Sequence, residues 1–281
     1  MKVFLVILSL LVLQAQNSSA PPLDFVCPMD PDVRAAIPGQ CPRCGMKLKA
    51  GVVDALEYPV QLTFHPRIIH PNTAVDLTFV IRDPKKGEPV RNFEVIHEKL
   101  FHLFIVSEDL THFVHDHPTL VKDGFRFRTT FPAPGMYRLL SDFYPTGGTP
   151  QLIERTVLVP GPVESKPPLA ADLKPKRGEN LEVELVTEPA VPIAGAKTLM
   201  FFRVKPAEGL EPYLGAWGHM LAASDDLIDT IHNHPFLADG GSQIQFNQIF
   251  PRARTYKVWV QFQRLGVVNT VAFTIPVSAL Q

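Results

Sequence analysis

The stretch from His102 to His117, HLFIVSEDLTHFVHDH, returns as HMLAASDDLIDTIHNH from His219 to His234. In both copies a histidine opens an apolar run, a serine-and-aspartate segment follows, and a His-x-His pair ends fifteen residues after the first histidine. Matching Phe-Pro and tyrosine positions occur downstream in each copy. The period of about 120 residues is the size of a domain rather than of a solenoid repeat. The sequence therefore predicts two tandem domains of one kind.

The first copy consists largely of short runs of β-branched and aromatic residues bounded by proline, glycine or aspartate, which is the pattern of β-strands. These runs cover residues 60–64, 75–82, 102–107, 125–131, 136–143 and 152–159. No segment carries a sustained helical period. Six or seven short strands in about a hundred residues predict an immunoglobulin-like β-sandwich, with a small barrel or jelly roll as the alternative topology. We expect an all-β chain with two such sandwiches in tandem.

The remaining segments differ in composition from the two copies. An apolar run begins at Val3, ends at Leu13 and is followed by small polar residues, which is typical of a secretory signal. Residues 160–178 are rich in proline and charge, as in a semi-rigid linker. The expected organisation is a signal peptide at 1–20, a metal-binding module at 21–54, sandwiches at 55–160 and 179–281, and a linker at 161–178. This arrangement predicts a periplasmic or secreted protein, with an uncleaved anchor as the alternative.

The chain has three cysteines, and all of them lie between positions 27 and 44. Cys27 is followed by Pro-Met, and the Cys41-x-x-Cys44 turn leads into Gly-Met. Thiolates gathered in one short segment usually share a metal ion or form a disulfide. We expect a metal site made by the three cysteines with thioether sulfur from Met29 or Met46. A disulfide between Cys41 and Cys44, with one odd thiol, is the alternative.

The types of ligand leave the identity of the metal open. Thioether sulfur suits Cu(I), which accepts trigonal or tetrahedral soft sites, whereas the carboxylate of the nearby Asp30 suits Zn(II) better. Copper is the expected ion and zinc the alternative. A zinc ion would serve to fold the segment, because about thirty residues cannot build a hydrophobic core of their own.

Residues 25–33, FVCPMDPDV, and 38–48, PGQCPRCGMKL, resemble the heavy-metal-binding domain of bacterial metal-resistance proteins. That module occurs at the N-terminus of some copper-transporting P-type ATPases and in some periplasmic adaptor subunits of metal-efflux pumps. The resemblance implies that the three cysteines and the two methionines contact the metal. The sequence departs from the family at Asp30, where relatives usually have histidine. Residues 107–118 and 134–137 also look like segments of secreted bacterial β-sandwich proteins associated with metal resistance.

The repeated histidines raise the question of a second metal site. Residues two apart in an extended segment project to one face, so the two histidines of each His-x-His pair can bind one ion. The first histidine of the same copy would be a third ligand if its strand is adjacent to that of the pair. Neutral imidazole is a good ligand for Cu(II) and Zn(II). The second-tier candidates are His102, His115, His117, His219, His232 and His234. The competing interpretation is structural, because histidine, serine and aspartate in such segments often bond the backbone of a turn.

Charge and hydropathy exclude several classes of function. The chain has 27 basic and 28 acidic residues, and removal of the first twenty leaves 26 against 28, a formal charge of −2. This balance gives no electrostatic footprint for nucleic acid. Nothing after residue 20 is long and apolar enough for a membrane span. The expected partners are a metal ion and a metal-efflux or metal-storage protein.

The motifs of common enzymes are missing from the sequence. There is no Gly-x-Ser-x-Gly elbow, Walker loop or dinucleotide fingerprint, and neither sandwich has the cysteine that a blue-copper site requires. We therefore expect a non-enzymatic periplasmic protein that binds a heavy metal, with copper first. The alternatives are an envelope interaction or structural protein whose module holds a zinc, and a metalloenzyme that uses the histidines of the first sandwich.

Overall fold

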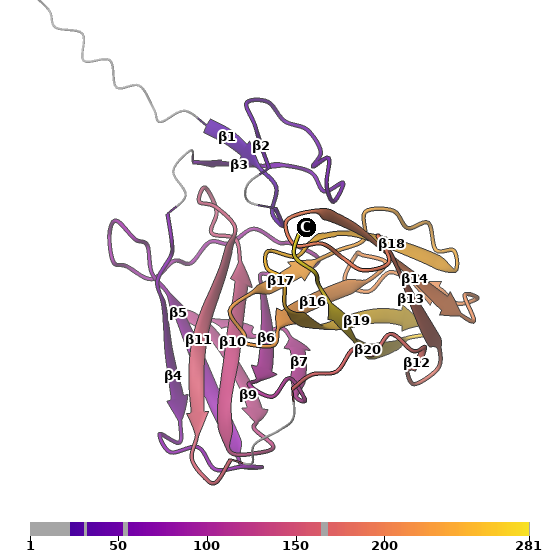
Figure 1. Ribbon diagram of the computed structural model, residues 1–281. Coiled ribbons are helices and arrows are strands. Elements are labelled where there is room, and N and C mark those ends of the chain that lie inside the picture. Colours follow the sequence, from indigo (N-terminus) through magenta and orange to yellow (C-terminus); the bar gives the residue numbers. More distant parts are fainter. Residues whose placement is uncertain (1–22, 31–32, 53–55, 164–167, 281) are drawn as a thin grey trace, which may run out of the picture.

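The computed structural model describes residues 23–30, 33–52, 56–163 and 168–280. The expected signal peptide lies outside these residues. Figure 1 shows a small N-terminal sheet beside two larger β-sandwiches, and no helix occurs in the described part of the chain. The described residues therefore include no helix that is long and apolar enough to cross a membrane. The predicted all-β architecture with two tandem sandwiches is confirmed.

The N-terminal module is a three-stranded antiparallel sheet in the order β2–β1–β3. Its strands are β1 (Leu23–Val26), β2 (Arg34–Ala35) and β3 (Lys49–Val52). Its core consists of the three cysteines and Leu48, with Phe25 and Val33 among the residues packed against them. The module contacts the first sandwich, where Lys49 forms an ion pair with Glu94 at 3.5 Å. Its small core gives sulfur an unusually large share of the packing.

The first sandwich has one sheet in the order β4–β5–β9–β8 and a second in the order β11–β10–β6–β7. Their core lies between the two sheets and includes Phe79, Phe101 and Phe125. In β5 every second residue is buried, as expected for a strand with one face on the core. The strands are β4 (Val60–His65), β5 (Ala74–Ile81), β6 (Phe101–Ser107), β7 (Phe113–Asp116), β8 (Thr119–Val121), β9 (Gly124–Thr130), β10 (Gly135–Phe143) and β11 (Gln151–Val159).

The second sandwich repeats this plan. One sheet has the order β12–β13–β14–β18, and the other has the order β15–β19–β16–β17, with β20 paired to β19. The backbone of Asp172 also bonds Thr274 on β20, so the chain before β12 runs along this sandwich. The strands are β12 (Lys176–Arg177), β13 (Glu182–Glu188), β14 (Lys197–Lys205), β15 (Leu210–Glu211), β16 (His219–Ser224), β17 (Thr230–Asn233), β18 (Gln243–Ile249), β19 (Thr255–Arg264) and β20 (Val267–Pro276).

The two sandwiches pack on each other through the sheets that contain β6 and β16. Both strands are buried at every residue, because one face covers their own core and the other covers the neighbouring sandwich. A separate apolar cluster fills this interface, and across it the rings of Phe113 and Trp259 stack with centroids 4.9 Å apart. Its buried members are Phe104, Val106, Leu110, Leu140, Leu221, Ala223, Leu227 and Trp259. Residues far apart in the sequence therefore share one water-excluded layer.

The serine-and-aspartate segment of the repeat forms the same turn in both copies. Ser107 Oγ donates to Asp109 at 2.5 Å, and Ser224 Oγ donates to Asp226 at 2.6 Å. The leucine that follows the aspartate has φ of 56° in the first copy and 53° in the second. This part of the motif is thus turn chemistry, as the structural interpretation expects.

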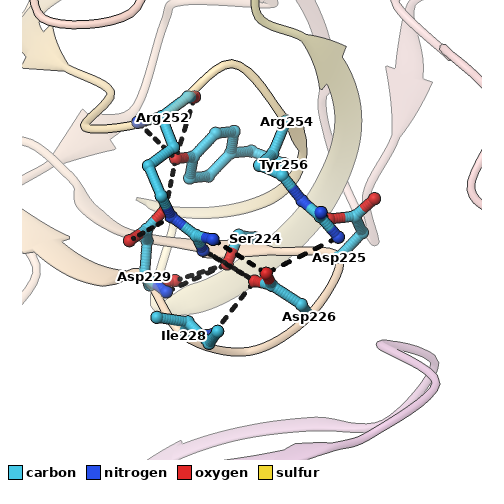
Figure 2. Close-up of polar contacts among 8 residues, drawn as sticks. All are labelled: Ser224, Asp225, Asp226, Ile228, Asp229, Arg252, Arg254 and Tyr256. Atoms are coloured by element: carbon cyan, nitrogen blue, oxygen red, sulfur yellow. Dashed lines mark hydrogen bonds and ion pairs between the residues drawn. The ribbon is translucent and has the colours of Figure 1, made fainter.

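In the second copy this turn is held by a polar network (Figure 2). The Arg252 guanidinium donates to Asp226 at 2.8 Å and to Asp229 at 2.9 Å. The hydroxyl of Tyr256 donates to the same Asp229 carboxylate at 2.5 Å. The network joins the turn after β16 to the chain that enters β19.

Candidate metal centres

Three thiols converge in the N-terminal module. Cys27 follows β1, and Cys41 and Cys44 flank a turn in which Gly45, with φ of 76°, donates its N–H to the carbonyl of Cys41. The Sγ atoms of Cys27 and Cys44 are 3.4 Å apart, and Cys41 Sγ lies 3.4 Å from Oδ2 of Asp30. The ligand atoms of the three cysteines and Asp30 all lie within 4.8 Å of one another. All three cysteines are free and buried, so the disulfide alternative does not describe this structure.

Backbone N–H groups point at two of the sulfur atoms. Those of residues 29–30 donate to Cys27 Sγ at 3.4 and 3.3 Å, and those of residues 43–44 donate to Cys41 Sγ at 3.4 and 3.5 Å. Such bonds favour the charged form of a group that accepts them, and here they favour thiolate. The turns after each cysteine therefore prepare the sulfur atoms to act as metal ligands.

The carboxylate of Asp30 gives the thiol cluster an oxygen atom. Oδ1 accepts a hydrogen bond from Arg43 at 2.9 Å, while Oδ2 faces the sulfur atoms of Cys41 and Cys27 at 3.4 and 3.7 Å. The ion pair fixes the orientation of the carboxylate, as outer partners commonly do for ligands. The ligand set predicted for copper did not include Asp30, which the sequence analysis considered only as an oxygen ligand for the zinc alternative.

The three thiols differ in how readily they ionise. A hydrogen bond from the Cys44 thiol, helped by the backbone N–H groups, lowers the pKa of Cys27 to about 7 against the effect of burial. The same bond raises the pKa of Cys44 far above its ordinary value, and burial raises the pKa of Cys41. Metal binding to three thiolates near neutral pH would therefore release roughly two to three protons.

The two methionines of the predicted ligand set occupy different places. Met29 and Met46 both pack against the cysteine cluster. The sulfur of Met46 lies 3.2 Å from Nε2 of His97, which belongs to the first sandwich. The Met46 side chain therefore connects the thiol cluster of the module with the histidines of the sandwiches.

Histidines of the first sandwich form one group of three nitrogen atoms, here called the first histidine group. His102 lies on β6, His115 lies on the adjacent β7, and His117 directly follows β7. Nδ1 of His102 is 3.2 Å from Nε2 of His115 and also 3.2 Å from Nε2 of His117. The structure thus brings together the three candidates from the first copy.

The second histidine group differs in composition from the set suggested by the repeat. Nδ1 of His219 lies 2.8 Å from Nε2 of His234, and the third nitrogen atom comes from His97. The rings of His97 and His234 stack with centroids 3.7 Å apart. His232, the counterpart of His115 in the first group, is not among these three residues, and its Nδ1 faces Asp142 at 2.6 Å. The second group therefore draws on both sandwiches.

A tight turn places His97 at the interface. The backbone of residues 96–99 closes through two hydrogen bonds of 2.9 and 3.0 Å, and the central His97 and Glu98 have φ of 46° and 63°. This is a type I′ turn, in which both central residues need positive φ. The second copy has the same turn at 213–216, with Leu214 in the position of His97. Comparison of the copies did not single out His97, because its counterpart cannot bind metal.

Hydrogen bonds across the interface are made in the same way from both sides. His115 Nδ1 donates to Oε1 of Gln261 on β19 at 2.6 Å, and His232 Nδ1 donates to Oδ2 of Asp142 on β10 at 2.6 Å. Gln261 and Asp142 are equivalent positions, because each lies five residues after the matching tyrosine of its copy. Each sandwich therefore orients a histidine of the other.

Burial keeps the clustered histidines neutral. It lowers the pKa of His102 to about 4 and that of His232 to about 3, while burial also raises the pKa of Asp142 to about 6. Burial likewise lowers the pKa of the other five members, which are His97, His115, His117, His219 and His234. At neutral pH these rings have the uncharged form that binds metal ions.

Comparisons with known protein families give separate matches to the N-terminal module and to the two sandwiches. The profile of a domain of unknown function, DUF8832, matches residues 52–161 and again 176–279, and that of a heavy metal binding domain matches residues 25–50. No curated protein matches the sequence.

The chain is also similar to several solved structures of bacterial and animal proteins. Adhesin InvE of Yersinia pseudotuberculosis is 13% identical over 78% of this chain, with a TM-score of 0.26, and the chain spans 60% of that protein's length. The fibronectin(III)-like modules of Clostridium thermocellum CbhA are 11% identical over 78% of this chain and 95% of theirs, with a TM-score of 0.23. A segment of two fibronectin type III domains from chicken tenascin is 10% identical over 78% and 99%, with a TM-score of 0.25.

Proposed function

The chain belongs to the DUF8832 family, of which it holds two copies behind a heavy metal binding domain, and we propose that it is a periplasmic copper-binding protein of metal handling or resistance. The observation that carries this proposal is the convergence of three free, buried thiols in the module. Thiols this close together repel one another once ionised, unless a cation lies between them. The compartment is proposed from the signal-like N-terminus of the sequence.

Copper in the Cu(I) state fits the sulfur atoms of the module. Three thiolates in a trigonal arrangement are a soft site, and soft ligands select Cu(I). With metal–sulfur bonds of about 2.3 Å, two sulfur atoms at the trigonal angle of about 120° lie about 4.0 Å apart. The Cys27 and Cys44 sulfur atoms, at 3.4 Å, need to separate by about 0.6 Å. The site is thus close to the geometry that a bound ion requires.

A carrier of this kind would deliver its ion to a metal-efflux or metal-storage protein by ligand exchange. The relative exposure of the cysteine side chains is only 0% to 7%, so a partner would approach through the turns that surround them. Exchange is supported by the raised pKa values of Cys41 and Cys44, because a sulfur atom that leaves the ion then takes up a proton near neutral pH. Direct transfer avoids release of free copper.

The deciding experiment measures the metal content of the protein purified under reducing conditions, together with a variant in which Cys27, Cys41 and Cys44 are all serine. We expect one copper bound to the module, lost in the serine variant and passed to a Cu(I) chelator within minutes. A wild-type protein whose metal content equals that of the serine variant would refute the proposal. Arg34→Gln, a change on β2 that leaves the cysteines intact, is the matched control.

A structural zinc site is the second candidate, and Asp30 is the observation that favours it. Three sulfur atoms and one carboxylate oxygen make a tetrahedral set that suits Zn(II), whereas trigonal Cu(I) does not need the oxygen. Asp30→Ala should therefore weaken zinc binding strongly and leave Cu(I) binding nearly unchanged. Zinc that resists chelators in the wild-type protein and is lost in Asp30→Ala would make the module a folding site instead of a carrier.

A further inference from the structure

The interface between the sandwiches has two histidine groups side by side. The ring centroids of His115 and His219, one from each group, are 5.5 Å apart, and those of His102 and His219 are 6.3 Å apart. The ring of His232 lies beside both groups, 4.5 Å from His234 and 5.7 Å from His102. Seven imidazoles thus share one largely buried layer.

The hydrogen bonds around the first histidine group leave lone pairs facing one another. His102 donates Nε2–H to the Ile96 carbonyl at 3.0 Å, so the Nδ1 atom of the neutral ring carries no hydrogen. His115 donates Nδ1–H to Gln261, so its Nε2 also carries none. These two nitrogen atoms are nevertheless 3.2 Å apart. Two lone pairs at this distance repel each other, and a cation between them removes the repulsion.

The nitrogen–nitrogen distances in this group match those around a bound ion. With metal–nitrogen bonds of about 2.0–2.1 Å, two ligands at a tetrahedral angle lie about 3.3 Å apart. Nδ1 of His102 is 3.2 Å from the nearest nitrogen of both His115 and His117. Two of the three pairs of nitrogen atoms in the first histidine group are thus already at the spacing of ligands on one ion, and all three atoms lie within 4.8 Å of one another.

The second histidine group adds a sulfur atom from the module. His219 donates Nε2–H to the Tyr213 carbonyl at 2.8 Å, which turns its Nδ1 toward His234 and His97 as in the first group. Met46 Sδ lies 3.2 Å from Nε2 of His97, at the edge of the same group. Three imidazoles and a thioether are a set that suits copper. This group contains residues from the module and from both sandwiches.

Two buried nitrogen atoms in this layer lack the partners that buried polar atoms normally have. Among the described residues, neither Nε2 of His232 nor Nδ1 of His234 has a hydrogen-bond partner. Their relative exposures are 6% and 2%. An unpartnered buried nitrogen is costly, so the layer has polar capacity that its own hydrogen bonds do not use. These two atoms differ from the nitrogen atoms that face each other within the two groups.

We propose that the interface of the two sandwiches is a second copper centre with two neighbouring sites, one formed by His102, His115 and His117 and the other by His97, His219 and His234 with Met46 beside it. This centre uses none of the thiols of the cysteine site, although Met46 of the module lies beside it. A cleft lined by Glu98, Lys99 and His117 gives access to its edge from solvent.

The test uses the full chain with all three cysteines replaced by serine, so that failure of the cysteine site does not affect the result. Metal-free protein at pH 7.5 is dialysed against Cu(II), and bound copper is counted. We expect about two ions per chain, with nitrogen coupling in the electron paramagnetic resonance spectrum wherever the copper gives a signal. Fewer than one ion would overturn the proposal, and a single ion would overturn the paired arrangement.

Single substitutions assign the two sites. His97→Leu puts into the turn of the first copy the residue that the second copy has there, and it should remove one ion, while His117→Asn should remove the other. His65→Gln, on the exposed end of β4, is the control and should retain both. Unchanged copper binding in the His97→Leu/His117→Asn double variant would contradict the assignment. Copper should raise the melting temperature of the parent and of the His65→Gln control but not that of the double variant, so this shift provides a second measurement.

Gln261→Leu tests the role of an orienting residue without removing a ligand. Loss of its hydrogen bond frees the His115 ring to rotate, and loss of such outer partners weakens metal binding by about 10- to 100-fold. We expect a loss of this size in copper affinity at the first site alone. Equal affinity in parent and variant would show that Gln261 has only a packing role.

Discussion

Lowering the pH from 7.5 to 5.5 should destabilise the metal-free protein through its buried histidines. The folded-state pKa is about 4 for His102 and about 3 for His232, against an ordinary value of 6.5 in the unfolded chain. Above pH 6.5 neither state is charged, and the histidines contribute no pH dependence. Below pH 6.5 the unfolded chain binds protons that the folded protein does not bind, so the free energy of unfolding falls.

The size of the effect follows from these pKa values. At pH 5.5 each of His102 and His232 lowers the free energy of unfolding by about 1.4 kcal/mol relative to pH 7.5. Asp142 acts in the opposite direction, because its pKa of about 6 lets the folded state bind a proton at a pH where the unfolded chain does not. Proton binding by Asp142 therefore raises the free energy of unfolding by about 0.8 kcal/mol between pH 7.5 and 5.5. The net loss from these three groups is about 2 kcal/mol, and the other five histidines add to it in the same direction. This loss is substantial compared with the free energy of unfolding of a typical domain, which is roughly 5–15 kcal/mol.

The assay is urea unfolding in the presence of a chelator at pH 7.5, 6.5 and 5.5, followed by the fluorescence of the two tryptophans, one of which is Trp259 at the interface. His102→Gln should reduce the difference between the extreme pH values by about 1.4 kcal/mol, because it removes one titrating group. His65→Gln/His70→Gln, which removes two exposed histidines, is the control and should keep the full difference. Equal free energies of unfolding at pH 7.5 and 5.5 would refute the argument that these imidazoles are held neutral.

Three further predictions concern the scaffold. Phe104→Ala removes a ring that is 1% exposed at the interface and should cost about 3–5 kcal/mol in urea unfolding, whereas Leu158→Ala, at a side chain that is 69% exposed, should cost less than about 0.5 kcal/mol. Gly124→Ala should fold poorly because its Cβ would lie 2.1 Å from the carbonyl oxygen of Phe79, whereas Gly39→Ala has open space and should leave the yield of soluble protein unchanged. Arg252→Ala should lower the melting temperature by breaking the bonds to Asp226 and Asp229, and recovery by Arg252→Lys would argue against a need for the guanidinium fork.

The sequence was sufficient to predict the sandwiches, because their long strands have a clear pattern. The continuous apolar run of β6 also contained a sign of burial on both faces, but no local pattern identifies the surface that covers the second face. β7 and β8 were missed as strands, since they have only four and three residues, and β8 is also largely exposed.

The candidate sites were predictable to the extent that their residues are close in the sequence. The three cysteines lie within one short segment, and the histidines of the first group lie on adjacent strands of one sandwich. His97 was not predicted as a member of the second group, because only the packing of the two sandwiches brings it to His219 and His234. The direction of the Met46 sulfur likewise depends on how the module contacts the first sandwich.

The matched contacts of His115 with Gln261 and of His232 with Asp142 make the interface self-complementary. This is the geometry of a two-fold homodimer whose subunits have been joined into one chain. In a true homodimer every substitution appears on both sides of the axis, whereas in a fused chain each half can change alone. The equivalent positions His97 and Leu214 differ in this way. Only the His97 side of the otherwise symmetric interface contacts Met46 of the module. Two copies in one chain thus allow the two sides of the interface to carry different residues, which two identical subunits could not do.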